Sequence, residues 1–320
     1  MSGLGIAAAV VGGLAVLAAA GSAYGAKKLF NSTIPRQKEV KVDTSEMADA
    51  AKWEEYKVII HERKDWLLAR EMEHITIKSR DDLTLHGDYI PADNESDTVA
   101  MCFHGYTGAG MKDCVSVAAF FVKQGFDCLV VDNRSHGQSE GEYIGFGILD
   151  RYDCLSWIKY INERFGGKKK IVLYGVSMGA ATVVMTAGFP ELPDNVKAII
   201  SDCAFTSPYD VFAHILKRDY HMAEFPVMNI NNAMSRKKAG YGFSDYSTLT
   251  AVKNTKCPIL FIHGKEDTFV PTRMSEENYA ACVSPKELLL VDNAGHAASY
   301  YENVPLYEKT VLEFLEKHMK

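Results

Sequence analysis

The sequence predicts an α/β protein with a doubly wound, mostly parallel sheet of about eight strands. Two observations support this fold class. Six continuous apolar runs of strand length lie between residues 98 and 292, as expected for parallel strands covered on both faces. Segments with helical spacing separate most of these runs, and such alternation of strands and helices builds a parallel sheet. The chain has 320 residues, 47% of them hydrophobic, which suffices for one large core and an appendage.

The N-terminal segment differs from the rest of the chain. From Leu4 to Ala26 there is no charged residue, and a helix rising about 1.5 Å per residue would cross the roughly 30 Å hydrocarbon core of a bilayer over that span. No Lys or Arg precedes Leu4, which favours a transmembrane anchor over a cleaved secretory signal. The positive charges that follow predict a single-pass protein with its main domain in the cytoplasm; they are Lys27, Lys28, Arg36, Lys38 and Lys41. Secretion after signal cleavage is the alternative.

We assign residues 1–30 to this anchor and residues 31–72 to a linker and a packing helix. The stretch from Asn31 to about Ser45 is polar and contains proline, which is typical of a linker. Apolar residues then recur at steps of three and four, which predicts a helix packed on the domain: Trp53, Tyr56, Ile59, Ile60, Trp66 and Leu67. A partner-binding helix is the alternative interpretation.

Residues 73–320 contain the main domain. Residues 74–79 and 83–90 alternate like an antiparallel pair of strands joined by a short turn. The apolar strands follow at 98–104, 126–132, 170–175, 196–202, 258–263 and 286–292. Helices are expected at about 113–124, 147–164, 178–188, 272–282 and 304–318.

One insertion interrupts this alternation at about residues 203–257. Over fifty residues separate two strands there, which is too many for a plain connection. Aromatic and methionine side chains are frequent in it, so we expect a cap over the carboxyl edge of the sheet, where open α/β sheets bind ligands. Additional packing helices are the alternative.

Composition excludes several classes of function. The formal net charge of -6 and the lack of a basic stripe argue against a nucleic-acid partner. The seven cysteines form no C-x-x-C pair and lie mostly in or beside apolar segments, which indicates buried thiols in a reducing compartment. No metal-ligand spacing and no dinucleotide-binding G-x-G-x-x-G motif is found, so we expect neither a metal nor a cofactor.

A serine stands where an expected strand ends and a helix begins. Residues 175–179 read G-x-S-x-G, with Ser177 at the centre. Flanking glycines permit the tight turn that exposes such a hydroxyl, and the unpaired N–H groups at the helix start stabilise a developing oxyanion. The pattern therefore predicts a nucleophilic serine.

A nucleophilic serine needs a histidine to accept its proton and a carboxylate to orient that histidine. On sheets with this turn the acid and the histidine follow the serine in that order. Asp267 comes just beyond the next-to-last strand and His296 in the loop after the last strand, on the same edge as Ser177. Asp202, at the end of an earlier strand, is the rival acid, and Asp292 lies too close in sequence to His296 to orient it.

From Glu73 to its C-terminus the chain resembles the α/β-hydrolase superfamily, in particular its bacterial esterase and lysophospholipase-like branch. The matching motifs are HGYTG at 104–108, DNRSHGQSEG at 132–141, the G-x-S-x-G turn, HGKEDTFVP at 263–271 and Gly295-His296. The resemblance implies a Ser177 nucleophile, a His296 base and an Asp267 acid. It also implies an oxyanion hole formed by the backbone N–H groups of Tyr106 and Met178. Residues 1–45 match nothing in this superfamily.

These inferences predict a serine hydrolase that cleaves carboxylic acid esters through an acyl-enzyme intermediate. Its substrate would be a small acyl ester or a lipid-like molecule. A lysophospholipase or monoacylglycerol lipase, a serine peptidase or amidase on the same fold, and a non-catalytic binding module are the alternatives. For His104, His136 and His263, each followed by glycine, we expect hydrogen bonds that stabilise turns. The sequence leaves the oligomeric state open.

Overall fold

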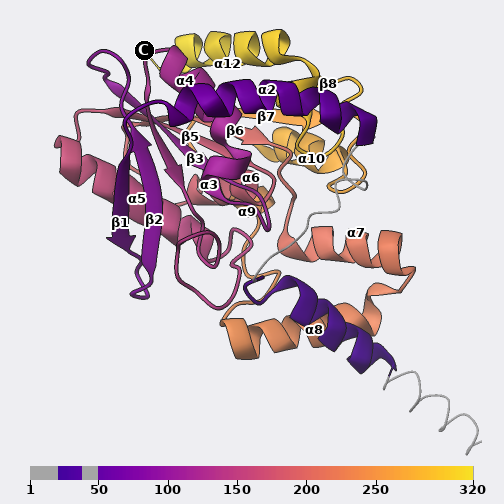
Figure 1. Cartoon of the computed structure of the whole chain (residues 1–320). Coiled ribbons are helices and arrows are strands. Elements are labelled where there is room, and N and C mark those ends of the chain that lie inside the picture. The colour runs from indigo at the N-terminus through magenta and orange to yellow at the C-terminus, as the bar shows by residue number, and fades with distance from the viewer. Residues whose placement is uncertain (1–20, 38–49, 320) are drawn as a thin grey trace, which may run out of the picture.

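The computed structural model describes residues 21–37 and 50–319, and it contains one eight-stranded sheet (Figure 1). The strand order is β1-β2-β4-β3-β5-β6-β7-β8. β1 to β2 and β2 to β4 are antiparallel pairs, and all other neighbours are parallel. The strands are β1 (Glu73–Lys78), β2 (Thr84–Ile90), β3 (Thr98–Phe103), β4 (Asp127–Val131), β5 (Lys170–Val176), β6 (Val196–Asp202), β7 (Ile259–Gly264) and β8 (Lys286–Val291). This confirms the expected mostly parallel sheet and its antiparallel first pair.

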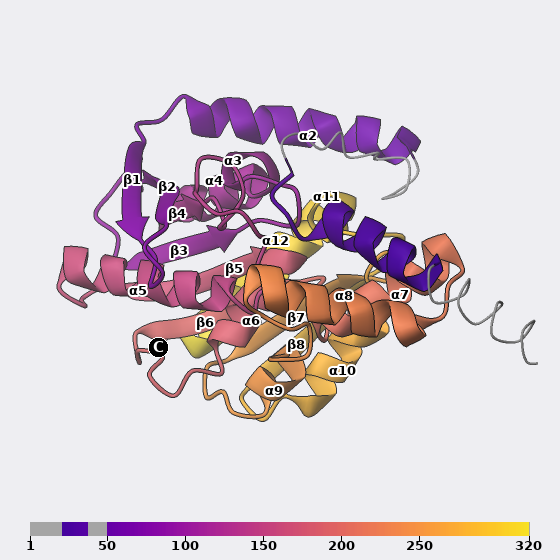
Figure 2. The same cartoon turned by 90° about the horizontal axis from the view of Figure 1, so that it is seen from below.

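Helices cover both faces of the sheet (Figures 1 and 2). One face carries α2 (Ala50–Leu68), α4 (Val115–Lys123) and α12 (Val304–His318), and the other carries α5 (Asp150–Phe165), α6 (Met178–Thr186) and α10 (Arg273–Ala281). The remaining labelled helices are α3 (Gly110–Asp113), α7 (Pro208–Tyr220), α8 (Glu224–Ala239), α9 (Thr248–Val252) and α11 (Ser299–Glu302).

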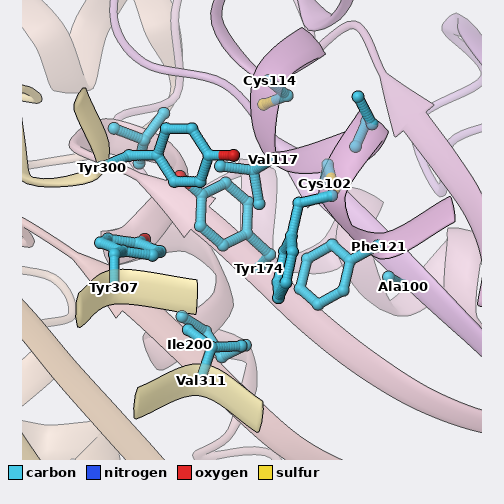
Figure 3. Close-up of a cluster of buried hydrophobic side chains, with 14 of the residues drawn as sticks. Ala100, Cys102, Cys114, Val117, Phe121, Tyr174, Ile200, Tyr300, Tyr307 and Val311 are labelled. Carbon is cyan, nitrogen blue, oxygen red and sulfur yellow. The ribbon is translucent and has the colours of Figure 1, made fainter. Parts of the chain in front are cut away.

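The core on the α2, α4 and α12 face joins helix aromatic side chains to strand aliphatic ones. Figure 3 shows Phe121 of α4, Tyr174 of β5 and Tyr307 of α12 in one cluster with Ile200 of β6. Tyr56 and Leu67 of α2 belong to the same cluster and are buried, so this helix packs on the domain as expected. All seven cysteines lie in the described part of the chain, where they are buried and free of disulfides, as predicted.

A third apolar cluster lies where residues 203–257 contribute α7 and α8. Phe212 and Leu216 of α7 and Met228 of α8 pack there with Met178 of α6. The helix α6 begins at the G-x-S-x-G turn, and this cluster packs on one side of α6. The two helices lie together beyond the sheet in Figure 1.

The N-terminal part of the chain departs from the expected anchor and linker. Residues 21–33 form a helix that packs on α8, and Phe30 and Ile34 are almost fully buried. After the helix, Ile34 accepts a backbone hydrogen bond from Ile144 (2.8 Å). Residues 21–37 are thus held against α7 and α8, because their apolar side chains share one buried cluster with these helices.

Residues 1–20 of the expected anchor and residues 38–49 lie outside the described residues. In the ranges that are described, no helix has both the length and the apolar character required to span a bilayer.

Phe30→Ala should lower the free energy of unfolding by about 3–5 kcal/mol, because it leaves a cavity in the cluster that joins the N-terminal helix to α7 and α8. Urea denaturation measures this change. Tyr24→Ala is the matched control, since Tyr24 lies on the same helix with 72% of its surface exposed and should change stability by less than about 0.5 kcal/mol. Equal effects of the two substitutions would contradict the docked helix.

Candidate active site

Ser177 occupies a strained turn between β5 and α6. Its φ of 55° and ψ of -114° lie outside the regions that L-residues prefer. The flanking glycines make this turn feasible. A Cβ at Gly175 would lie 2.2 Å from the Gly179 carbonyl oxygen, and one at Gly179 would lie 2.1 Å from the Phe103 oxygen. The G-x-S-x-G spacing thus reflects close backbone approaches on both sides of the serine.

The structure brings Ser177, His296 and Asp267 into one hydrogen-bonded chain. The Ser177 Oγ to His296 Nε2 distance is 2.9 Å, and the His296 Nδ1 to Asp267 Oδ2 distance is 2.7 Å. The three side chains are buried, with 7% or less of each residue exposed. Because an ionised carboxylate only accepts hydrogen bonds, Nδ1 carries the imidazole proton and Nε2 is free to accept from the serine.

Four donors surround the Asp267 carboxylate. Oδ1 accepts from the backbone N–H groups of Phe269 and Val270 (2.9 Å each), and Oδ2 accepts from His296 and His263. Burial alone would raise the pKa of this group, but the two imidazoles outweigh that effect and hold the pKa of Asp267 far below its usual range. Asp267 is therefore ionised.

The rival acids have different surroundings. Asp202 Oδ2 accepts from the Tyr307 hydroxyl (2.9 Å), and burial raises the pKa of Asp202 to about 6. Asp292 is mostly exposed and pairs with Lys265 at 2.5 Å. In the described part of the chain, Asp267 is the carboxylate that contacts His296.

Asp202 gives a prediction about stability and pH. Its folded pKa of about 6 exceeds the value of about 3.9 for an unfolded chain, so the folded state binds this proton more tightly. Its contribution to stability is fully present below about pH 4 and is lost as the pH rises through about 6. Asp202→Asn should therefore gain about 2 kcal/mol relative to the unsubstituted protein between pH 4 and pH 7, measured by urea denaturation. A difference in unfolding free energy between the two proteins that stays constant from pH 4 to pH 7 would contradict the raised pKa of Asp202.

The loop at residues 104–108 flanks the nucleophile. A Cβ at Gly105 would lie 3.5 Å from the Ser177 Cβ. Within the described residues, the backbone N–H groups of Tyr106 and Met178 donate to no protein acceptor. Free N–H groups on this loop and at the start of α6 meet the chemical requirement of an oxyanion hole.

Two histidines fix this loop, as the sequence analysis expects. His136 Nε2 accepts from the Thr107 N–H (3.2 Å), and His104 Nε2 accepts from the Asn133 N–H (3.0 Å). Their Nδ1 atoms donate to the carbonyl oxygens of Arg134 and Gly105. Burial lowers the pKa of both imidazoles, which keeps them neutral and able to accept these bonds.

His263 has a larger part in the site than sequence reasoning assigned to it. Its Nε2 faces Asp267 Oδ2 at 3.0 Å and the Val270 oxygen at 2.9 Å, so it carries a proton and donates. Its Nδ1 lies 2.6 Å from Ser275 Oγ. The spacing of His263 four residues before Asp267, at a strand end, was the signal available in the sequence.

His263→Leu should lower kcat about 10- to 100-fold with little change in KM, because a hydrogen bond to a charged group contributes about 1.5–3 kcal/mol. His263→Gln retains a donor of similar reach and should recover part of the rate. Steady-state kinetics on a soluble substrate measures both variants. If the leucine and glutamine variants lose kcat equally, the donated bond is not the cause.

Cys203 lies beside the triad. Its Sγ, an Asp267 oxygen and a His296 nitrogen lie within 4.8 Å of one another. Burial, followed by the Asp202 and Asp267 carboxylates, raises the pKa of the thiol well above its ordinary value. Because the thiolate is the metal-binding form and the other two groups already bond to each other, we assign this cluster to the serine site and not to a metal.

Comparisons with known proteins show the family to which the chain belongs. The model of the prolyl oligopeptidase family (Peptidase_S9) matches residues 113–320. The uncharacterized protein YqkD of Bacillus subtilis is 29% identical over 232 residues, which are 72% of this chain and 75% of that protein. The solved esterase Pf2001 of Pyrococcus furiosus is 26% identical with a TM-score of 0.64, and the match covers 79% of this chain and 95% of the esterase chain.

The acylaminoacyl peptidase of Pyrococcus horikoshii shares the fold at 21% identity and a TM-score of 0.58, over 77% of this chain and 41% of the peptidase. The family match spans the nucleophile turn and the segments that carry the candidate acid and base. The chain therefore belongs to the prolyl oligopeptidase family of serine hydrolases, within the α/β-hydrolase superfamily.

Proposed function

We propose that this serine hydrolase cleaves carboxylic acid esters, with Ser177 as nucleophile, His296 as base and Asp267 as acid. The observation that carries the proposal is the continuous chain of hydrogen bonds from Ser177 Oγ through His296 to Asp267. Its geometry supports the chemistry, because the Ser177–His296 bond falls within the range that proton transfer requires and the Asp267–His296 bond holds the imidazole in place.

In the first half-reaction, Ser177 Oγ attacks the acyl carbonyl while His296 Nε2 takes the hydroxyl proton. The carbonyl oxygen becomes an oxyanion, and the free N–H groups of Tyr106 and Met178 would stabilise it. Asp267 stabilises the imidazolium that forms. His296 then gives the proton to the departing alcohol, which leaves the acyl group on Ser177.

In the second half-reaction, water attacks the acyl-enzyme and gives its proton to His296. The tetrahedral intermediate collapses to release the carboxylic acid, and Ser177 Oγ recovers its proton from His296. No group beyond the three side chains, the two N–H donors and water takes part in this scheme.

The surroundings of Ser177 favour an apolar acyl group. Met178 and Tyr106 belong to or pack on the apolar cluster that includes Phe146, Phe205 and Phe212. Hydrophobic walls with a few polar groups are typical of sites for small molecules. The apolar cluster beside Ser177 supports a small acyl ester or a lipid-like ester as the substrate.

Fluorophosphonate labelling and an ester panel test the proposal together. We expect a fluorophosphonate to label the unsubstituted chain and not Ser177→Ala. We also expect p-nitrophenyl esters of increasing acyl length to be hydrolysed with acyl-enzyme accumulation. Labelling without turnover on any ester would overturn the ester hydrolase proposal and leave a binding or amide-cleaving protein.

Amide cleavage is the second candidate, because the family itself is named for a peptidase. The match covers 95% of the Pf2001 esterase chain but 41% of the acylaminoacyl peptidase chain, which supports ester cleavage as the first candidate. A p-nitrophenyl ester and a p-nitroanilide with the same acyl group separate the two. A higher kcat/KM on the anilide would reverse this order.

We also propose which segments of the chain form the catalytic domain and which segment attaches it to a membrane. Residues 73–320 would form the catalytic domain with the cap at about 203–257, and residues 1–20 would attach it to a membrane. The absence of charge in those first residues supports the attachment. Since residues 21–37 pack on the cap, their place is with the catalytic domain.

A further inference from the structure

Three exposed aromatic residues gather at the end of the cap farthest from the sheet. We call Tyr24, Tyr220 and Phe225 the aromatic corner; their exposed fractions are 72%, 47% and 76%. A Cβ at Gly25 would lie 3.2 Å from the Met222 Cε, so the start of the N-terminal helix touches the connection between α7 and α8. Figures 1 and 2 both show these segments meeting at one end of the cap. An exposed apolar group of this kind marks an interaction surface.

The chain reaches this corner directly from its least polar stretch. Residues 1–20 contain no Asp, Glu, Lys, Arg or His, and the described helix begins at residue 21, beside the corner. The membrane to which we propose that residues 1–20 attach would therefore lie next to Tyr24. Tyrosine suits the boundary between lipid and water because its ring is apolar and its hydroxyl is polar, and phenylalanine suits the apolar side of that boundary.

Cationic side chains surround the corner. Lys27 and Lys28 are exposed on the N-terminal helix, and Lys217 is exposed near the end of α7. Lys217 lines an open hollow of about 550 Å³ with His221, Met222, Ala223 and Glu224. Asp219 is paired with Arg218, and Glu224 offsets one of the three lysines, which leaves an excess of positive charge at this edge. Such an arrangement suits the anionic headgroups of a bilayer.

The aromatic corner is also connected, through packed side chains, to the residues around Ser177. Phe30 of the N-terminal helix, Phe212 of α7 and Met178 belong to one buried cluster. The Tyr106 hydroxyl donates to the Ser32 oxygen (3.2 Å), so the helix touches the loop that flanks Ser177. A bilayer bound at the aromatic corner would therefore lie next to the segments that pack over Ser177.

We propose that the aromatic corner docks on an anionic lipid bilayer and that the substrate is an amphiphilic acyl ester taken from that bilayer. The second part of this inference rests on the proposed ester hydrolysis. The first part does not depend on ester hydrolysis; it rests on the surface of the cap and the N-terminal helix and on the proposed attachment of residues 1–20 to a membrane.

Tryptophan fluorescence tests the docking in the full chain. Phe225→Trp places a reporter at the corner, and Val283→Trp places one at a residue that is 67% exposed between α10 and β8. The probe is a vesicle of phosphatidylcholine and phosphatidylglycerol in equal amounts, with brominated acyl chains. After subtraction of the signal of the unsubstituted chain, we expect vesicles to quench the reporter at position 225 and to leave the reporter at 283 unchanged.

Several outcomes would overturn the docking. These are no binding to vesicles, binding without quenching at position 225, and equal quenching at both positions. A concentration-dependent change at position 225 in the absence of vesicles would assign the corner to a second copy of the chain instead.

Activity measurements on embedded and dissolved esters distinguish a failure of membrane docking from a failure of the proposed ester hydrolysis. Phe225→Ser should lower hydrolysis of an ester embedded in these vesicles about tenfold, with no change on a dissolved p-nitrophenyl ester, and Val283→Ser should change neither rate. Equal rates of the two variants on the embedded ester would overturn the substrate assignment. If no ester is hydrolysed at all, the proposed function fails, while the quenching experiment still decides the docking.

Discussion

Ser177→Ala should lower kcat for ester hydrolysis by about 10⁶, equivalent to roughly 8 kcal/mol of activation free energy. The alanine removes the only atom that can form the acyl-enzyme, and the remaining N–H donors and His296 can only assist direct attack by water. Single-turnover kinetics on a p-nitrophenyl ester, together with fluorophosphonate labelling, measures the loss.

Ser201→Ala is the matched control for this substitution. Ser201 lies on β6, paired with Gly175 beside the nucleophile turn, and its hydroxyl is buried without a hydrogen-bond partner in the described part of the chain. Its removal should leave kcat within a few fold of the unsubstituted value. A Ser177→Ala variant that retained more than a small residue of activity would remove Ser177 from the mechanism.

Much of the fold follows from local sequence. β3, β4 and β7 are buried at every position, and strands of this kind appear as unbroken apolar runs that need no knowledge of their partners. The candidate site follows from the same property. Ser177, Asp267 and His296 each come after a recognisable strand, and the carboxyl ends of parallel strands meet at one edge of the sheet.

The parts that sequence could not provide depend on contacts between distant segments. Leu29, Phe30 and Ile34 are apolar enough for either a membrane or a protein core, and only their packing on α8, two hundred residues away, assigns them to the cap. His263 is a local case: Asp267 lies only four residues later, and this spacing indicates that the two are close but not that the imidazole donates to the carboxylate. Neither contact leaves a periodic pattern in the sequence.

Asp267→Asn should lower kcat by about 10⁴ while the fold is retained. Four donors converge on the native carboxylate, two on each oxygen. An amide has only one acceptor oxygen, so its NH₂ group must face either the backbone N–H groups or the imidazoles. If the oxygen stays with the backbone, the NH₂ group faces His296 Nδ1 and favours the tautomer protonated on Nε2. That tautomer cannot accept the Ser177 proton.

Asp202→Asn separates this effect from the loss of any buried carboxylate near the site. Asp202 is as deeply buried, yet in the described residues its one side-chain bond is to Tyr307 and its Oδ1 has no partner. An amide can accept the Tyr307 bond equally well, so kcat should fall less than about tenfold. Replacing an aspartate by asparagine removes the negative charge and keeps the shape, so it should affect kcat strongly only at the residue that orients His296 through its charge. A larger loss of kcat in Asp202→Asn than in Asp267→Asn would therefore transfer the role of acid to Asp202.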